Sequence, residues 1–178
     1  KIRALGSEAK SCIGDVTAPE FGTRIVKATL DAFGGIDIIV NNAGYAWDGV
    51  IQKMTDEQWY AMLDVHATAP FRILRAASDF IRSAAKKEKE EGRSFNRKVV
   101  NISSIAGMFG NAGQMGYSAG KAAIVGMTKT MAKEWGRYQV NVNCVAFGLI
   151  QTRMTQPVGS GAAVEAVGHG RHVCRLIQ

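Results

Sequence analysis

The stretch that decides the fold runs from Ile36 to Gly44 and reads IDIIVNNAG. Its beginning is almost continuously apolar and rich in β-branched side chains, which is typical of a strand buried on both faces of a sheet. Asn41-Asn42 then ends the strand, and Ala43-Gly44 supplies small residues that let another group approach the backbone. Asparagine offers both a donor and an acceptor at this point, although the motif alone also fits an ordinary turn.

Further strands are predicted on both sides of this stretch. Residues 98–102 (KVVNI) and 140–146 (VNVNCVA) have the same apolar character, and residues 11–16 (SCIGDV) form a weaker candidate. Nearly continuous apolar strands of this kind predict a sheet that is covered on both faces.

Longer amphipathic stretches separate these strands. Residues 17–20 (TAPE) predict a helix cap with Glu20 in the capping-box position, and that helix ends near Phe33 before a Gly-Gly pair. A second helix is predicted to begin at residues 55–58 (TDEQ), and a third runs from about Gly116 to Arg137. The alternation predicts an α/β fold with a parallel sheet and right-handed crossovers.

The composition is that of a globular protein. The 178 residues are 47% hydrophobic and 21% charged, with 20 Gly and 3 Pro, which excludes disordered and collagen-like classes. No apolar run approaches the roughly 20 residues that span a bilayer, so we expect no membrane contact. Cys12, Cys144 and Cys174 lie far apart in the sequence, so we expect a reducing cytoplasm rather than a disulfide framework.

The net charge of +7 raises the question of nucleic-acid binding. The basic residues are scattered, and the densest run, residues 86–91 (KKEKEE), is mixed in sign. That run is typical of a solvated helix end, and no nucleic-acid motif accompanies it. We therefore expect no nucleic-acid partner, and salt-dependent binding to DNA or RNA would contradict this.

Chemistry is suggested first by Tyr117 and Lys121, which share one helix face at a spacing of four residues. A phenol is a poor acid–base group at neutral pH, but a nearby ammonium stabilises the phenolate. Ser103 and Ser104 follow a predicted strand, where parallel sheets place ligands. A hydroxyl at that point can bond the oxygen that Tyr117 protonates, while helix or turn capping is the alternative role.

The ordered set of motifs resembles the short-chain dehydrogenase/reductase family. It comprises residues 41–44 (NNAG), 101–104 (NISS), Tyr117-x-x-x-Lys121 and 141–143 (NVN), and the resemblance covers about Asp15 to Thr155. Residues 110–114 (GNAGQ) make the chain most similar to the 3-oxoacyl-acyl-carrier-protein reductase branch. The resemblance implies a cytoplasmic oxidoreductase of fatty acid metabolism that uses NADP or NAD. It also implies a small carbonyl or acyl thioester substrate, and a homotetramer built through the helices around residues 59–81 and 115–137.

The resemblance also implies the roles of individual residues. Tyr117 is the proton donor or acceptor, Lys121 stabilises its phenolate and holds the nicotinamide ribose, and Ser104 orients the substrate carbonyl. The remaining residues that the resemblance assigns to cofactor binding are Asp15, Val16, Asn41, Ala43, Gly44, Ile150 and Thr152. No metal is implied, although residues 169–174 (HGRHVC) have donor types that also fit a metal site.

The chain departs from the family pattern at His66, where the family has a catalytic Asn whose backbone carbonyl binds a relay water. Pro70 lies four residues on and has no N–H, so it cannot bond the His66 carbonyl in the helical manner. We expect a kink that leaves this carbonyl free for water. The His66 ring is then either passively packed or part of the proton relay, since imidazole titrates near neutral pH. A second departure is Phe147 in place of the family's Pro, which either loosens the turn or packs against cofactor or substrate.

The Gly-rich phosphate turn of a dinucleotide fold has no match before Asp15. We therefore expect a partial Rossmann-type, doubly wound parallel sheet that lacks the N-terminal strand-turn-helix-strand. In the family order 3-2-1-4-5-6-7, the strand near Cys12 would be third and without neighbours, and the last strand has no clear match. The expected organisation is a partial dinucleotide-binding catalytic domain over residues 1–155, followed by a Gly-rich tail or a substrate-side loop insertion over 156–178. We expect both to be cut from a domain of roughly 250 residues. The alternative to an oxidoreductase is a catalytically incompetent fragment, or an interaction module that retains the fold.

Overall fold

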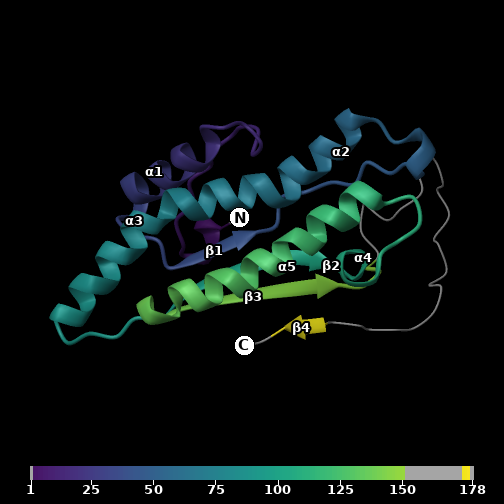
Figure 1. Ribbon diagram of the computed structural model, residues 1–178. Coiled ribbons are helices and arrows are strands. Elements are labelled where there is room, and N and C mark those ends of the chain that lie inside the picture. The colour runs from purple at the N-terminus through teal and green to yellow at the C-terminus, as the bar shows by residue number, and fades with distance from the viewer. Residues whose placement is uncertain (1, 151–173, 177–178) are drawn as a thin grey trace.

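The computed structural model describes residues 2–150 and 174–176, and in them a four-stranded sheet in the order β1-β2-β3-β4 carries the helices (Figure 1). The strands are β1 (Ile38–Asn41), β2 (Arg97–Ser104), β3 (Val140–Phe147) and β4 (Cys174–Leu176). β1, β2 and β3 are parallel, and β4 is antiparallel to β3. The predicted α/β fold with a parallel sheet is confirmed, and the short β4 provides a last strand that the sequence did not reveal.

The longer helices are α1 (Phe21–Phe33), α2 (Asp56–Leu63), α3 (Ala69–Glu90), α4 (Ile105–Phe109) and α5 (Met115–Trp135). Short 3-10 turns are η1 (Arg3–Leu5), η2 (Ile51–Lys53) and η4 (Gly136–Tyr138). α2 begins with the expected capping box, because the side chain of Thr55 accepts from Gln58 N and that of Gln58 accepts from Thr55 N. α1 ends as expected at Gly34, whose φ of 71° suits a residue without a side chain.

The start of α1 differs from the prediction. The helix begins at Phe21, and its N-cap Glu20 makes no side-chain capping bond. Asp15 instead accepts bonds from both the backbone N and the hydroxyl of Thr17, each at 2.8 Å. This local turn closes the segment before the helix, while the amides of Phe21 and Arg24 donate to the backbone carbonyls of Ala18 and Glu20.

The predicted strand at residues 11–16 does not form, so its assignment as the third strand of the family was wrong. Ile13 is 89% exposed, and its carbonyl accepts a bond from Arg24 Nη2 at 3.1 Å. A strand needs a neighbour to satisfy its backbone donors and acceptors, and this segment pairs with no strand of the described sheet.

α2 and α3 are joined by a π-helical turn, η3 (Asp64–Thr68), in which the Ala69 amide bonds back to the Asp64 carbonyl. The turn lies directly before Pro70, which is the second residue of α3. The helix therefore accommodates the proline by a local π turn rather than by the simple kink expected from the sequence. The turn presents His66 from the middle of a long helical segment.

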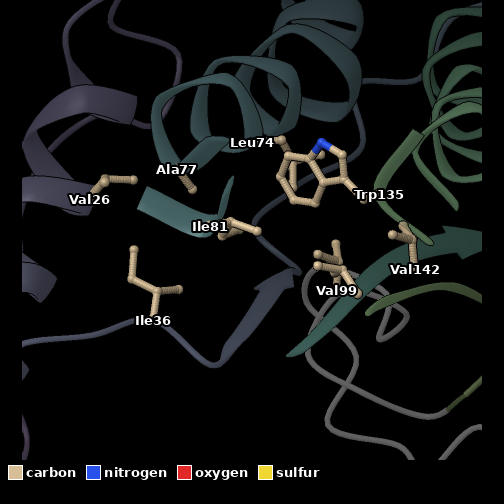
Figure 2. Packing of buried hydrophobic residues seen from close by; sticks show 9 residues of the cluster. Val26, Ile36, Leu74, Ala77, Ile81, Val99, Trp135 and Val142 are labelled. Atoms are coloured by element: carbon tan, nitrogen blue, oxygen red, sulfur yellow. The ribbon is translucent and has the colours of Figure 1, made fainter. Parts of the chain in front are cut away.

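The core lies between one face of the sheet and the helices α1, α3 and α5 (Figure 2). Val26 of α1, Ile81 of α3 and Trp135 of α5 pack with the paired strand residues Val99 and Val142. Burial alternates along β2 and β3, as expected for a sheet that is packed on one side.

The second face of the sheet was expected to be covered, but the described part of the chain leaves it open along β1. Ile38 and Val40 are 64% and 57% exposed, although both belong to the apolar stretch that predicted the strand. Alternating burial, rather than burial on both faces, is therefore what these strands show.

A buried ion pair connects α3 to β2. Arg97 is 4% exposed, and its guanidinium donates to the two carboxylate oxygens of Glu88 at 2.9 and 2.7 Å. Its Nε also donates to the Ile36 carbonyl at 3.2 Å. The bond from Arg97 lowers the pKa of Glu88, so the carboxylate is the form that holds α3, β2 and the approach to β1 together.

Replacement of Ile81 by alanine tests this packing. Ile81 is 1% exposed, so Ile81→Ala is expected to lower the free energy of unfolding by about 2–5 kcal/mol, because it leaves a cavity between α3 and the sheet. Ile13→Ala is the matched control, since Ile13 is 89% exposed, and it should change stability by less than about 0.5 kcal/mol. Urea denaturation measures both, and a large loss in Ile13→Ala would mean that residues 11–16 are packed after all.

Candidate active site

The carboxyl ends of β1, β2 and β3 meet at one edge of the sheet, because the three strands run parallel and in register. A cavity of about 350 Å³ opens at this edge. The sequence-predicted residues that line it come from the loops after β1 and β3, from the last residue of β2 and from two helical segments. They are Gly44, His66, Ser104, Tyr117, Lys121 and Ile150.

α5 carries Tyr117 and Lys121 into this cavity from the same side. Lys121 Nζ lies 5.7 Å from the centroid of the Tyr117 ring and donates to the Ile102 carbonyl at 2.8 Å. Lys121 is 6% exposed, and this burial lowers the pKa of its ammonium to about 8. The side chain is therefore a cation at neutral pH that loses its proton only slightly above it.

The two serines at the end of β2 have different partners. Ser103 Oγ donates to the Lys121 carbonyl at 2.7 Å, so it docks α5 against the strand. Ser104 Oγ accepts from the Ala106 amide at 3.2 Å and caps α4, as the alternative reading proposed. Ser104 also lines the cavity, and its hydroxyl proton remains available to an oxygen placed there.

His66 faces the same cavity from η3 and is 3% exposed. Its Nε2 lies 2.8 Å from the Tyr45 carbonyl oxygen, and its ring meets that of Tyr117 edge-on, with centroids 5.0 Å apart. Burial, followed by the charge of Lys121, lowers the pKa of His66 to about 4. The imidazole is therefore neutral under ordinary conditions.

Asn41 and Asn42 stand next to each other at the end of β1 but lie in different surroundings. Asn41 Nδ2 donates to Asn101 Oδ1 at 2.8 Å, and Asn101 Nδ2 donates to Thr128 Oγ1 at 2.9 Å. This chain of bonds joins β1, β2 and α5 beneath the cavity. Asn42, which the sequence reasoning passed over although it stands in the same motif, is the asparagine that lines the cavity.

Other predicted cofactor residues do not gather there. Asp15, Val16, Asn41 and Ala43 are not among the described lining residues, and Thr152 lies outside the described part of the chain. Phe147 does line the cavity, so its ring is placed to touch a ligand. The roles of Asp15, Val16, Asn41, Ala43 and Thr152 in cofactor binding stay predictions.

A link that the sequence did not reveal joins the loop after β1 to the start of α5. Gln114 Nε2 donates to the two carboxylate oxygens of Asp48 at 3.1 and 3.0 Å. The Gly49 amide also donates to the Gly113 carbonyl at 2.7 Å. This link ties the β1 loop to α5 close to Tyr117.

Metal and membrane features were also searched within residues 2–150 and 174–176. No group of three or more His, Cys, Asp or Glu side chains gathers there, and no helix in these ranges is long and apolar enough to cross a membrane. The possible metal ligands at residues 169–173 lie outside the described residues.

The residues in the cavity can bind a group that carries hydroxyls or amides. The cavity offers the Lys121 ammonium, the hydroxyls of Ser104 and Tyr117, and an imidazole nitrogen, His66 Nδ1, that is buried without a partner in the described structure. Gly44 has no side chain, so a ligand can come close to the backbone of this loop. Hydroxyl and amide groups are the ligands that such a set of donors and acceptors binds.

Comparison with known proteins gives a consistent result. The family model described as short chain dehydrogenase matches residues 1–163. The 3-oxoacyl-[acyl-carrier-protein] reductase FabG of Vibrio cholerae is 40% identical over 152 residues, which cover 85% of this chain and 58% of that protein. The peroxisomal hydratase-dehydrogenase-epimerase of Saccharomyces cerevisiae is 39% identical over 139 residues, covering 78% of this chain and 14% of that protein.

A solved structure agrees with these matches. A short chain dehydrogenase from Mycobacterium avium superimposes with a TM-score of 0.76 at 34% sequence identity, covering 89% of this chain and 52% of the other. The chain therefore spans between about half and two thirds of the length of such reductases and of this solved structure.

The close contact between Gly44 and His66 gives a test of the site geometry. A Cβ on Gly44 would lie 2.5 Å from His66 Cε1, so Gly44→Ala is expected to displace the ring and lower the free energy of unfolding by about 1–3 kcal/mol. Gly49→Ala is the control, because its Cβ would meet neighbours only at 3.6 Å and beyond. Chemical denaturation of both variants measures the difference, and equal stability would show that His66 does not press on Gly44.

Proposed function

Since this chain belongs to the short-chain dehydrogenase family, we propose that it carries the acid–base machinery of a nicotinamide-dependent oxidoreductase. The proposed reaction interconverts a carbonyl group and a secondary alcohol. The observation that supports it most directly is that Ser104, Tyr117 and Lys121 line one cavity at the carboxyl edge of the sheet. The alternative, an interaction module without activity, gives no reason for these three groups to meet.

In this proposal the chain orients the substrate and exchanges a proton with it. When bound, NADP or NAD supplies or accepts the hydride at the carbonyl carbon. The Ser104 hydroxyl donates a hydrogen bond to the carbonyl oxygen and orients it. The Tyr117 hydroxyl transfers its proton to that oxygen during reduction and takes it back during oxidation.

Lys121 has two tasks in this scheme. Its ammonium lies beside the Tyr117 ring, so its positive charge stabilises the phenolate that remains after proton transfer. It is also the cation at this edge of the cavity that can hold ribose hydroxyls. Gly44 and Asn42 line the same cavity, where they can contact the bound nucleotide.

The substrate proposed is a 3-oxoacyl thioester. The support is the 40% identity to the Vibrio cholerae reductase, whose name specifies such a substrate on acyl carrier protein. A cytoplasmic homotetramer acting in fatty acid metabolism is likewise a proposal, with α2, α3 and α5 as its interfaces.

Replacement of Tyr117 by phenylalanine tests the assigned chemistry. The full-length protein carrying Tyr117→Phe is expected to reduce an acetoacetyl thioester about 10²–10⁴-fold more slowly, because the general acid is lost while the ring remains. NADPH and NADH oxidation followed by absorbance measures the rate.

The control for this test is Tyr138→Phe, which makes the same change on a tyrosine of η4 that is not among the described residues lining the cavity. This variant should keep the wild-type rate. Equal rates in Tyr117→Phe and wild type would overturn the proposed mechanism.

A further inference from the structure

The loop that follows β1, residues 42–50, forms one wall of the cavity but contains no helix or strand. Asn42 and Gly44 line the cavity, while almost all residues of the loop are exposed. An exposed segment of this kind keeps a defined position only where it is tethered to the rest of the fold. The tethers of the loop therefore decide the shape of this wall.

One tether joins the loop to the start of α5. Gln114 Nε2 donates to Asp48 Oδ1 at 3.1 Å and to Oδ2 at 3.0 Å. Beside this contact, the Gly49 amide donates to the Gly113 carbonyl at 2.7 Å. Gln114 Oε1 accepts from Asn111 Nδ2 at 2.8 Å, so both ends of the glutamine amide are bonded. Because a carboxylate can only accept, the amide must turn its NH2 group toward Asp48.

Gln114 is the fixed half of this tether. It is the N-cap of α5, and the Ser118 amide donates to its carbonyl at 2.7 Å. Two residues further on, Gly116 packs on α2 so closely that a Cβ would lie 3.2 Å from Met62 Cβ. Asp48, in contrast, is an exposed residue of an irregular loop. The side-chain bonds between Asp48 and Gln114 therefore form a latch that holds the loop on a rigid helix.

The order of residues along α5 indicates which part of the site the latch adjoins. Lys121, Tyr117 and Gln114 follow one another at spacings of four and three residues, so they lie in a row along one side of the helix. In the proposed function, Lys121 holds the ribose and Tyr117 meets the carbonyl oxygen. The row continues away from the nucleotide, so Gln114 adjoins the place of the acyl part of the substrate.

Apolar side chains adjoin both halves of the latch. Trp47 precedes Asp48 and is 40% exposed, and Met115 follows Gln114 and is 47% exposed. Neither Asp48 nor Gln114 is among the described residues that line the cavity, so both act through the loop rather than by touching the reacting atoms. Exposed apolar side chains beside polar ones are typical of a binding surface, and they suit the hydrocarbon of an acyl group.

We propose that Asp48 and Gln114 are positioning residues whose bond holds the loop after β1 in place on the acyl side of the active-site cavity. The inference rests on the proposed function, since it takes a 3-oxoacyl thioester as the substrate. With the latch open, the loop occupies its binding-competent position for only part of the time, and the apparent affinity for the substrate falls by that fraction. The latch therefore acts on the KM of the thioester rather than on kcat or on the Kd of NADPH, which binds at the other end of the row.

An exchange of the two latch groups in the full-length protein tests this role. Gln114→Glu places two carboxylates opposite each other, so the KM for an acetoacetyl thioester is expected to rise about tenfold. Adding Asp48→Asn restores the bond in reverse, because the asparagine NH2 can donate to the new carboxylate. The double variant Asp48→Asn/Gln114→Glu should return KM to within about threefold of the wild-type value. In both proteins kcat and the Kd for NADPH should change less than about twofold, because uniform binding of the thioester alone is affected.

The matched control is Gln52→Glu, which makes the same change in charge on η2. Gln52 is exposed and is not among the described residues that line the cavity. This variant should keep the wild-type KM, since it adds a carboxylate near the same loop without breaking the latch. A rise in KM equal to that of Gln114→Glu would mean that charge alone is responsible, and the proposal would fail.

Hydrogen exchange of the Gly49 amide, followed by NMR without substrate, reports on the loop itself. The exchange should be faster in Gln114→Glu and should return to the wild-type rate in the double variant. The proposal is overturned if Gln114→Glu keeps the wild-type KM or the wild-type exchange rate, or if the double variant stays as impaired as Gln114→Glu. An equal rise in the Kd for NADPH would overturn it as well.

Failure of the proposed function gives a different result. A wild-type rate in Tyr117→Phe would end the acid–base scheme, whereas the exchange of the Gly49 amide would still decide whether the latch holds the loop. An acid–base scheme that stands beside an unchanged KM in Gln114→Glu would end the latch alone.

Discussion

Two hydrogen bonds between α5 and β2 hold the site together. Ser103 Oγ donates to the Lys121 carbonyl at 2.7 Å, and Lys121 Nζ donates to the Ile102 carbonyl at 2.8 Å. They clamp the helix that carries Tyr117 onto the strand that ends in Ser104. α4 packs closely against the same helix, since a Cβ on Gly107 would lie 2.6 Å from the Lys121 carbonyl carbon. The positions of Tyr117 and Ser104 relative to each other are therefore set by backbone packing of helices against a strand.

The same burial acts on two neighbouring titratable groups, and its consequence differs for each. It lowers the pKa of Lys121 to about 8, so the ammonium survives at neutral pH and lends its charge to the site. It lowers the pKa of His66 to about 4, so the imidazole stays neutral and offers a lone pair. One cavity is thus lined by a cation and by a neutral imidazole.

Much of the framework could be predicted from the sequence, because hydrophobic pattern and end signals act locally. Individual residues predicted the capping box at Thr55 and the end of α1 at Gly34. Apolar runs predicted the strands around Val40, Val99 and Val142. Residues 11–16 have a similar pattern but form no strand, because a strand also needs a neighbour. Pairing depends on distant segments that periodicity does not report.

The site could be predicted as a set of residues but not as an arrangement. The motifs identified Ser104, Tyr117 and Lys121, and the structure brings them to one cavity. They did not show that Asn41 belongs to a bonding chain beneath the cavity while Asn42 lines it. The π turn and the buried Nδ1 of His66 were also out of reach. The first depends on backbone bonding from Ala69 back to Asp64, and the second on how Gly44 and Gly120 pack against the His66 side chain.

Burial against β2 lowers the pKa of Lys121 to about 8, which makes this side chain a cation that loses its proton readily. The most direct measurement is an NMR titration of the Lys121 side-chain amine, assigned by its absence in Lys121→Arg. Because the pKa is lowered, the account predicts a midpoint near pH 8, with the charge present below it and lost above it. A midpoint at the ordinary lysine value of about 10.4 would contradict the account, since the ammonium would then be solvated rather than clamped beneath the site.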